Sequence, residues 1–474
     1  MMAVIRALIF GFILTAIASV QCYAQSVFAN VSALRANTAL IYTAYISGYS
    51  TASDGGEGQL NYVSSDTTSS DNGCTIYVDA ANHRYYRSAG FGMINVKWCG
   101  AKGDGSTSDT SAINAAIHIA CNPAGTAPTY PFGNGAVFAP PGTYIVNGGI
   151  NMTNISGGNV SSGCILRGAG QSATVFSSTT STNATIDLTG SSDVLLENFW
   201  IRAGATSGSG TSYGLLIAAS NSQACNVNTF RNVTMDGWFD QAGVYIYNCS
   251  DCLVEESVFA SYYTSLFADV YIGASNVLGA TSSYATITTV NPAQSGNWQF
   301  VRSEIHDLSA RSGSSTVIPL LISGSFSPIV FQGGVIAGST TKANGGLITL
   351  NNSPTGLVFI GNQFYADYGS APDYDFFGNS GTISGMVVQG NNFQAGVGIF
   401  TAVNSSAWSG LNVTGNGPFS VSLFYPLSAN NGTLTGSIVD AQGQAVNLGG
   451  VVTHNVFIHP GTVTAGTQSN NGSF

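Results

Sequence analysis

Charged side chains are scarce in this sequence. Asp, Glu, Lys and Arg together make up 7% of its 474 residues, against ~25% in an average protein. The hydrophobic share of 44% is ordinary, and Ser, Thr, Asn and 59 Gly take the place of the missing charge. The scarcity does not indicate disorder, because 25 Phe and 21 Tyr can bury a large core. A surface of small uncharged polar groups suits stacked strands, where like charges repel, so the composition predicts an all-β protein.

Basic residues are the scarcest charges. Only 12 Lys and Arg stand against 22 Asp and Glu, a formal net charge of −10. No basic patch can be assembled from so few, which excludes nucleic acid as a partner. The negative net charge also repels a strongly anionic glycan, so such a substrate is disfavoured unless a cation bridges the protein and the glycan.

Long apolar runs are absent, with one exception at the N-terminus. Arg6 precedes an uncharged apolar run of 14 residues, 7–20, and Ala24 completes an A-x-A-like exit. This pattern is typical of a secretory signal peptide and is too short to span a bilayer comfortably. We predict that residues 1–24 are removed, that no segment spans a membrane, and that the mature chain is secreted, periplasmic or at the cell surface. A lipoprotein anchored through Cys22 is the alternative, but Gln21 is a poor neighbour for that processing.

Cysteine is too sparse to suggest a metal centre. Loss of Cys22 with the signal leaves seven of the eight cysteines, and an odd number leaves at least one thiol free or paired between molecules. Cys249-x-x-Cys252 has no second ligand pair at zinc spacing, so we expect no metal site of that kind. The pairing of the cysteines stays open at this stage.

Turn signals and periodicity divide the mature chain. Residues 25–90 alternate short strand-like stretches with glycine turns such as Asp71-Asn72-Gly73, which predicts a small β-rich leader. Further on, Asp109 is a good N-cap for a helix that would cover the open end of a stack of strands. One face of that helix carries Ile113, Ala116, Ile117 and Ala120.

From about residue 160 to 420 a short unit recurs, in which a polar residue or glycine precedes an apolar position that we expect to anchor in the core. Successive anchors lie 34, 25, 47, 30, 29 and 29 residues apart. A period of ~20–50 residues indicates a solenoid or a propeller, and propeller blades need ~40–45 residues. The shorter spacing favours the solenoid. The anchors are Phe199, Val233, Val258, Ile305, Val335, Phe364 and Phe393.

Two intervals predict segments that leave the stack. The 47-residue interval indicates a loop between about Ser261 and Asn297, and that segment and its edges hold Tyr262, Tyr263, Phe267, Tyr271, Tyr284 and Trp298. A shorter departure at 365–379 contains three acids. Two of them, Asp373 and Asp375, could hold Ca²⁺ through their oxygens, but a solvated loop is the simpler interpretation, and no cofactor is required.

The segment at 94–144 carries a recognisable signature. The run Ile94 to Gly105, then Ser108-Asp109-Thr110, the helix at 112–117 and the turn Pro140-Pro141-Gly142-Thr143-Tyr144 resemble the opening segment of the pectate-lyase-superfamily β-helices. These include rhamnogalacturonase- and epimerase-like proteins and many phage tailspikes. The leader, with Gly48 to Gly58, Asp66-Thr67-Thr68 and Arg84, is similar to one that often precedes it in tailspike-like proteins.

The resemblance implies a right-handed parallel β-helix with a short N-terminal capping α-helix, over residues 91–425. Residues 426–474 would form a polar C-terminal tail or end cap. It also implies a long polysaccharide as partner, and tailspike-like relatives are commonly homotrimers. The chemistry is not carried over, because the sequence has neither Asn-Thr-Asp followed by Gly-His-Gly, as in polygalacturonase-type hydrolases, nor the Trp-x-Asp-His of pectate lyases.

Acidic residues gather in the central units, and glycoside hydrolysis needs two of them ~5–9.5 Å apart. Six lie in consecutive units beside the predicted loop: Asp236, Asp240, Glu255, Glu256, Glu304 and Asp307. We predict a catalytic role for Asp236, Glu256, Glu304 and Asp307. We assign substrate binding to Tyr262, Tyr263, Trp298 and His306, with His306 also a candidate for proton transfer. Taken singly, each acid could equally accept backbone N–H bonds, and the aromatic residues could pack the loop.

Three function classes remain open. We expect an enzyme that cleaves a glycosidic bond, with hydrolysis better supplied than elimination, because the only basic residues of the central units are Arg202, Arg231, Arg302 and Arg311. A non-catalytic carbohydrate-binding tailspike or adhesin would use the same face without a working carboxylate pair. A purely structural surface protein would need neither.

Overall fold

The computed structural model describes the chain from residue 25 onward with gaps, and the predicted signal segment 1–24 lies outside the described residues. The described ranges are 25–88, 92–121, 135–155, 163–179, 184–203, 213–219, 225–239, 241–261, 263–264, 268–273, 296–307, 318–324, 328–338, 346–365, 374–378, 381–394, 398–402, 407–417, 422–424, 433–440, 446–458, 460–461, 463–469 and 471–473. They fold into two compact units, one formed by residues up to 90 with 97–100, the other by the remainder. In these ranges no helix is long and apolar enough to cross a membrane.

The first unit is a five-stranded sheet with one helix, in the range predicted to be a β-rich leader. Its order is β1-β2-β3-β5-β4, in which β1 and β2 are parallel and the other neighbours antiparallel. The helix packs on the sheet through Val31 and Leu34. The elements are β1 (Ser26–Phe28), α2 (Val31–Arg35), β2 (Thr43–Ile46), β3 (Gly58–Tyr62), β4 (Ile76–Val78) and β5 (Arg84–Arg87), with the 3₁₀ turn η1 (Val96–Cys99).

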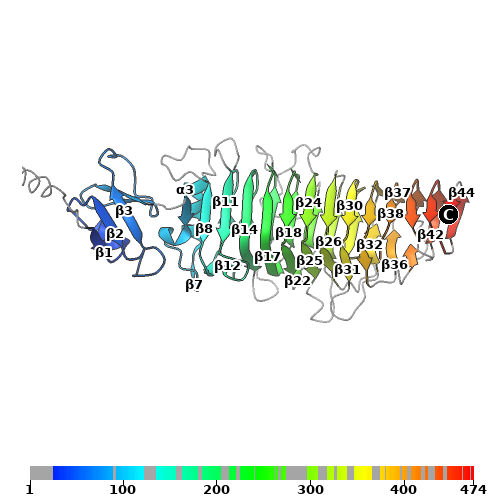
Figure 1. The fold of residues 1–474 in the computed structure, drawn as a ribbon, viewed down its shortest axis with the longest axis horizontal. Coiled ribbons are helices and arrows are strands. Elements are labelled where there is room, and N and C mark those ends of the chain that lie inside the picture. Colours follow the sequence, from blue (N-terminus) through cyan, green and yellow to red (C-terminus); the bar gives the residue numbers. More distant parts are fainter. Residues whose placement is uncertain are drawn as a thin grey trace, which may run out of the picture. The chain divides into compact units, whose positions relative to one another are not determined.

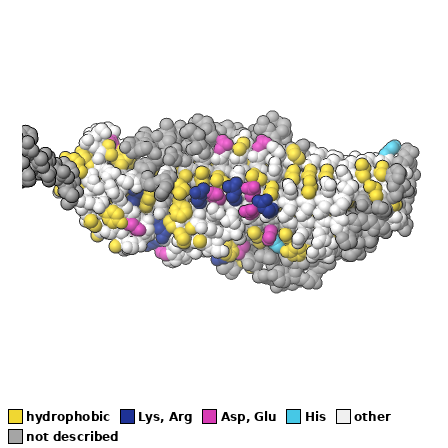
Figure 2. Space-filling view, in the orientation of Figure 1, with side chains coloured by type: hydrophobic (Ala, Val, Ile, Leu, Met, Phe, Trp, Pro, Cys, Tyr) yellow, Lys and Arg dark blue, Asp and Glu magenta, His cyan; other side chains and the backbone are white. Residues whose placement is uncertain are grey.

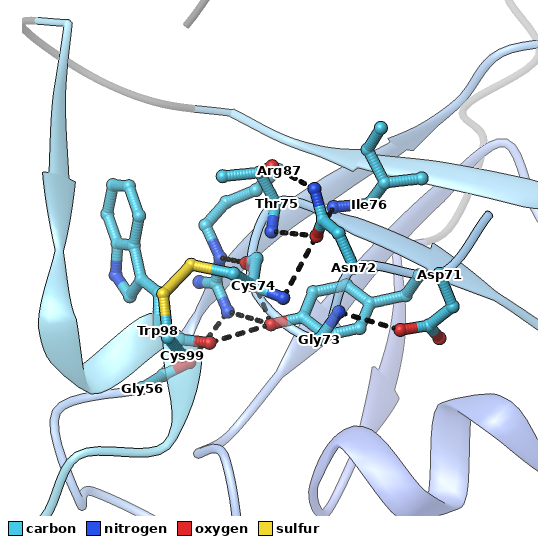
Figure 3. Close-up of a disulfide and its surroundings, with 11 residues drawn as sticks. Gly56, Asp71, Asn72, Gly73, Cys74, Thr75, Ile76, Arg87, Trp98 and Cys99 are labelled. Carbon is cyan, nitrogen blue, oxygen red and sulfur yellow. Dashed lines mark hydrogen bonds between the residues drawn. A yellow bond between two sulfur atoms is a disulfide. The ribbon is translucent and has the colours of Figure 1, made fainter. Parts of the chain in front are cut away.

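A buried arginine organises this unit. Arg87 is 2% exposed and donates to the carbonyl oxygens of Gly56 (3.0 Å) and Cys74 (3.3 Å). Its guanidinium also lies over the Trp98 ring, 4.9 Å from the centroid. The Cys74–Cys99 disulfide lies beside it (Figure 3). Because carbonyl oxygens and an aromatic face satisfy the cation, no carboxylate is needed at its side.

The second unit stacks short strands in parallel register (Figure 1). Each complete rung supplies a strand to a first stack, then a second, then a third. The first and second stacks belong to one 23-stranded sheet, because the long strands β14 and β17 run through both. This is the predicted right-handed parallel β-helix.

The strands are distributed as follows. The first stack holds β6 (Met93–Asn95), β8 (Ala136–Ala139), β11 (Cys164–Gly168), β14 (Val194–Ala203), β17 (Thr229–Phe239), β20 (Leu253–Glu255), β24 (Trp298–Val301), β27 (Ile329–Gln332), β30 (Leu357–Ile360), β34 (Val387–Gln389), β38 (Asn412–Thr414), β41 (Ile438–Asp440), β43 (Val456–Ile458) and β45 (Gly472–Ser473). The second holds the latter halves of β14 and β17 with β7 (Asp104–Ser108), β9 (Gly142–Ile145), β12 (Thr174–Ser178), β21 (Val258–Ser261), β22 (Tyr263–Thr264), β25 (Glu304–Asp307), β28 (Val335–Ala337), β31 (Gln363–Tyr365) and β35 (Asn392–Phe393).

The third stack is a separate sheet. It holds β10 (Ile150–Asn151), β13 (Ala184–Asp187), β15 (Tyr213–Ala218), β18 (Ala242–Tyr247), β23 (Ala268–Gly273), β26 (Ile318–Ser323), β29 (Ile348–Asn351), β32 (Tyr374–Gly378), β33 (Thr382–Ser384), β36 (Gly398–Ala402), β37 (Ala407–Ser409), β39 (Ser422–Phe424), β40 (Thr433–Thr435), β42 (Val446–Thr453) and β44 (Val463–Ser469). A short pair, β16 (Cys225–Asn226) and β19 (Cys249–Ser250), lies apart from it. Parallel pairing thus continues past residue 425, through the range predicted to be a tail or end cap.

The turn from first to second stack repeats one backbone conformation. A single residue per rung takes a left-handed φ there, from 48° at Arg302 to 65° at Gly361. This conformation favours Gly and Asn, which fill most of the column. In order it contains Asn198, Asn232, Glu256, Arg302, Gly333, Gly361, Gly390 and Gly415. The column includes four of the polar residues and glycines that recur in the sequence: Asn198, Asn232, Glu256 and Gly333.

Directly after this turn, buried amides form a ladder inside the helix. Asn362, Asn391 and Asn416 are 2%, 1% and 8% exposed. The Oδ1 of Asn391 accepts from the backbone N–H (2.8 Å) and side-chain amide (3.0 Å) of Asn362, and its Nδ2 donates to the Phe359 carbonyl (2.9 Å). Asn416 repeats the pattern on Asn391. The ladder satisfies backbone groups that the turn removes from strand pairing.

Apolar side chains stack between the sheets. One column runs Phe300, Phe331 and Phe359, with ring centroids 4.6 and 4.9 Å apart. Ile305, Phe364 and Phe393 are buried in another column, as predicted for anchors. Val258 and Val335 are not anchors: they are half-buried, and Phe259 and Ile336 fill the inward positions. The period-2 alternation makes a one-residue offset reverse the face.

The predicted capping helix is α3 (Thr110–Cys121), which packs against β6, β8, β10 and β11. Its four predicted face residues are fully buried. Asp109 precedes it as predicted, but its carboxylate accepts from the backbone N–H groups of Lys102 (2.6 Å) and Gly103 (3.2 Å). The acid therefore fixes the preceding loop to the helix start.

Cysteines link neighbouring rungs. Cys121–Cys164 joins the end of α3 to β11, and Cys225–Cys249 joins adjacent strands. Cys252 is free and buried, which agrees with the odd number left by the signal. Burial raises the pKa of its thiol to about 12.

The predicted excursions are shorter than expected. The interval 261–297 includes strand β23, whose Tyr271 is buried and stacks on Tyr245 with ring centroids 5.1 Å apart. Asp375 lies in β32, is fully buried, and has no hydrogen-bond partner for either oxygen. The expectation of a solvated loop at Asp375 is therefore wrong, while Asp373 lies outside the described residues.

We predict that Asn391→Ala lowers the free energy of unfolding by about 1–3 kcal/mol, because it leaves buried partners of both its amide groups unsatisfied. The neighbouring exposed Asn392→Ala is the matched control. Denaturant midpoints of the two variants provide the measurement. Equal midpoints would contradict a stabilising role for the ladder.

We predict that Asp375 makes stability fall as pH rises. Complete burial raises the pKa of its carboxyl well above its usual range, so the folded state keeps a proton that the unfolded state loses above about pH 3.9. The free energy of unfolding should drop by up to about 1.4 kcal/mol per pH unit from there to the raised pKa. In Asp375→Asn this component should vanish. A variant with the same pH dependence as the wild type would refute the assignment.

Candidate functional site

The outer face of the second stack gathers polar and aromatic side chains, and we call it the second-stack face. Alternation places Trp200 and Arg202 of β14 outward, since Ile201 between them is buried. Arg202 pairs in register with Asp236 of β17. Two residues along β17, Trp238 is half-buried. A carboxylate therefore lies between two tryptophans on adjoining strands.

Asp236 is more enclosed than Glu304 on this face, with a side chain 12% exposed against 46%. The indole Nε1 of Trp200 donates to its Oδ1 at 2.9 Å, and Arg202 Nε donates to the same oxygen at 3.3 Å. The Arg202 guanidinium also lies over the Trp200 ring, 4.2 Å from the centroid. Burial raises the pKa of the Asp236 carboxyl, against the lowering effect of Arg202 and the two hydrogen bonds.

A second acid lies further along the same face. Glu304 and His306 of β25 are two residues apart and point to one side, with Glu304 Oε2 and His306 Nε2 3.0 Å apart. The glutamate side chain is 46% exposed and the imidazole 13%. Tyr365 of β31 packs edge-on against His306, at a centroid distance of 6.2 Å.

Strand register fixes the separation of the two groups. Met235 pairs with Phe259, so Asp236 lies beside Ala260, and Ala260 pairs with His306. Asp236 and His306 are therefore two rungs apart, about 9.4–9.8 Å along the helix. Ala260 between them is 5% exposed. Glu304 pairs with Val258, which pairs with Thr234, so its carboxyl group lies two rungs and two residues from Asp236.

The other predicted site residues lie elsewhere. Glu256 occupies the left-handed turn and pairs with Arg302 at 2.9 Å, with both side chains more than half exposed. Trp298 is a core residue: it is 1% exposed, stacks on Phe300, and donates from Nε1 to the Cys249 carbonyl at 2.8 Å. Its predicted contact with substrate is therefore wrong, because strand β24 begins at this residue and turns the indole inward.

Four residues named in the sequence analysis cannot be placed as side chains. Tyr262 and the nearby Asp240 lie outside the described residues. Tyr263, in β22, pairs with Trp238, and Asp307 ends β25. Only the backbone of these last two is described. Their predicted roles remain predictions.

Glu255 belongs to a different face. In the first stack, Arg167, Glu197, Arg231 and Glu255 follow one another in register. Arg231 Nε donates to Glu255 Oε2 at 3.0 Å, and Glu197 accepts from Arg167. Figure 2 shows such a row, in which basic and acidic side chains alternate along the molecule. Glu197 lies between two arginines and Glu255 lies beside one. Of the predicted acid cluster, Glu255 therefore belongs to a ladder of ion pairs.

Sequence reasoning missed Trp200, Trp238 and Tyr365, and it named Arg202 only as a basic residue of the central units. The two tryptophans were detectable, because Trp200-x-Arg202 and Asp236-x-Trp238 have the period-2 spacing of one strand face. Tyr365 had no local signal, since only the pairing of β25, β28 and β31 brings it beside His306. Among the described residues, no three His, Cys, Asp or Glu side chains come together as a metal site.

Comparison with known families matches two regions. Residues 93–313 match the family described as rhamnogalacturonase A/epimerase, pectate lyase-like, and residues 27–90 match the phage tail protein small four-stranded β-sheet domain. No curated protein matches the chain.

Similar solved structures are tailspikes. The enzymatically active domain of tailspike protein 2 of bacteriophage CBA120 is 15% identical, with a TM-score of 0.59 over 90% of this chain and 60% of that one. The full-length form of tailspike protein 2, from an Escherichia coli O157:H7 bacteriophage, is 14% identical, with a TM-score of 0.55 over 89% of this chain and 52% of that one. Tailspike gp49 of Acinetobacter baumannii bacteriophage Fri1 is 12% identical, with a TM-score of 0.51 over 95% of this chain and 75% of that one.

This chain therefore spans only half to three fifths of tailspike protein 2 in these two forms. At such low identity the likeness concerns the fold. The two family matches cover the opening segment of the β-helix and the leader, the same regions that carry the resemblance in the sequence. Residues 93–313 thus match the pectate-lyase-like family, and the described strands form a right-handed parallel β-helix whose fold is similar to that of phage tailspikes.

Proposed function

We propose that this protein cleaves glycosidic bonds of a polysaccharide on the second-stack face, outside the cell. The observation that carries the proposal is the enclosed acid Asp236, held by Trp200 and Arg202, with Glu304 two rungs away. Gp49, one of the similar tailspikes, is described as a capsular polysaccharide depolymerase. A face of stacked rungs is long and shallow, which suits an extended glycan.

The two acids have suitable environments for different roles. Asp236, whose pKa is raised by burial, is the proton donor to the leaving oxygen. Glu304 is more exposed and is the base that activates a water, oriented by its contact with His306. Glu304 lies two rungs and two residues from Asp236, a diagonal of about 12 Å between backbones, and the side chains must shorten this separation to the ~6.5–9.5 Å typical of inverting hydrolases. The step needs no cofactor.

Neutral and acidic polysaccharides should be incubated with the protein, following reducing ends together with the ultraviolet absorbance of unsaturated sugars. Hydrolysis predicts new reducing ends without that absorbance. Both signals together would indicate a lyase and replace the proposed chemistry. Binding without cleavage would make the protein a carbohydrate-binding spike or adhesin.

We predict that Asp236→Asn and Glu304→Gln each lower kcat/KM by about 10²–10⁴-fold, because each removes proton transfer in the transition state. Glu255→Gln is the control, since Glu255 lies in the ion-pair ladder of the first stack. Thermal unfolding should confirm that all three variants are folded. Full activity of either site variant would contradict the assigned pair.

A further inference from the structure

Arg202 makes two contacts that a bound sugar would affect. Its guanidinium covers the Trp200 ring at 4.2 Å, and its Nε donates to Asp236 at 3.3 Å. Its side chain is nevertheless 46% exposed, against 12% for Asp236. The residue is therefore held by these contacts and not by the core.

The three side chains form a triangle. Trp200 and Arg202 lie on the same side of β14, and Asp236 is the register partner of Arg202 on β17. Trp200 Nε1 donates a hydrogen bond of 2.9 Å to Asp236, and this bond fixes the orientation of the indole ring. A ligand that stacks on the exposed ring face must therefore compete with the guanidinium, because the indole cannot turn away without losing that bond.

We propose that Arg202 is a displaceable cover: a sugar ring that stacks on Trp200 takes the place of the guanidinium and separates it from Asp236. This inference rests on the proposed function and adds a regulatory step to the same site. Arg202 is a positioning residue, since it acts through Asp236. Exchange of one stacked group for another on an aromatic face costs little, because an exposed cation–aromatic contact contributes only about 0.5–1 kcal/mol.

The displacement of Arg202 changes the proton affinity of Asp236. Arg202 is the charged group that opposes the rise of the Asp236 pKa, and burial is the larger, opposing influence. Of the described strands beside β17, β14 contributes Arg202, and β21 presents Ala260 and no charge at this position. His306 lies two rungs away, and only the backbone of Tyr263 is described. Loss of the guanidinium therefore leaves burial dominant, and the acid takes up a proton when substrate arrives.

This arrangement explains how one carboxyl group can serve in two states. In the free protein the cation limits the cost of a buried carboxylate. In the complex the sugar covers the site, and the neutral acid is the form that can protonate a leaving oxygen. Substrate binding and acid formation are thereby coupled.

The test compares pH profiles of Arg202→Ala with the wild type. The kcat/KM profile reports groups of the free protein, and the kcat profile those of the complex. In the wild type, the alkaline limb of kcat should lie at higher pH than that of kcat/KM. In Arg202→Ala the alkaline limb of the kcat/KM profile should move to higher pH by about one unit or more. The alkaline limb of the kcat profile should stay where it is, so that the two limbs coincide.

Arg167→Ala is the matched control, because Arg167 also pairs with an acid on the next rung, Glu197, but on the first stack. Its profiles should match the wild type. Coincident limbs in the wild type would overturn the proposal, since the substrate would then leave Asp236 unchanged. An unshifted kcat/KM profile in Arg202→Ala would do the same.

A direct titration separates this inference from the proposed function. The carboxyl carbon of Asp236 can be followed by NMR in isotopically labelled protein, with and without an oligosaccharide that binds, and assigned with Asp236→Asn. If the oligosaccharide binds without being cleaved, the proposed function fails, yet a raised pKa in the complex still supports the cover. If no member of the panel binds, or binding leaves the pKa unchanged, the cover is refuted.

Discussion

The structure depends on how each rung turns a corner without losing its hydrogen bonds. Between the first and second stacks one residue takes a left-handed backbone conformation, and the next residue points inward. In the later rungs that inward residue is Asn362, Asn391 or Asn416, whose amide binds the backbone of neighbouring rungs. Because these later corners are satisfied in the same way, their rungs can be stacked in register, and the core column of Ile336, Phe364 and Phe393 follows from that register.

The outer faces follow from the same register but differ in chemistry. On the first stack, opposite charges alternate in a column and neutralise one another, which allows a chain with 7% charge to keep its few ions paired. On the second stack, Asp236 has one cationic partner and an indole, so burial governs its proton affinity. The same spacing of strands thus produces a structural ladder on one face and a candidate acid on the next.

Glu256 and Arg302 show how closely the two faces are connected. Both occupy the left-handed column that Gly or Asn fills in most rungs, and they pair with each other across the rungs. A strained position occupied by larger side chains is frequent near functional sites. Here the pair lies at the turn between the ion-pair ladder of the first stack and the second-stack face that carries Asp236.

The sequence by itself determined the fold class, the capping helix and the rhythm of the repeat, because each depends on local features: the helical spacing of Ile113 to Ala120, and the Gly or Asn that a left-handed turn requires. It also pointed to Asp236, Glu304 and His306. Tertiary structure alone decided which face each side chain joined. A shift of one residue turns Val258 outward, the start of β24 turns Trp298 into the core, and pairing in register joins Glu255 to Arg231. Only the register between rungs, which no local pattern encodes, brings Arg202 to Asp236 and Tyr365 to His306.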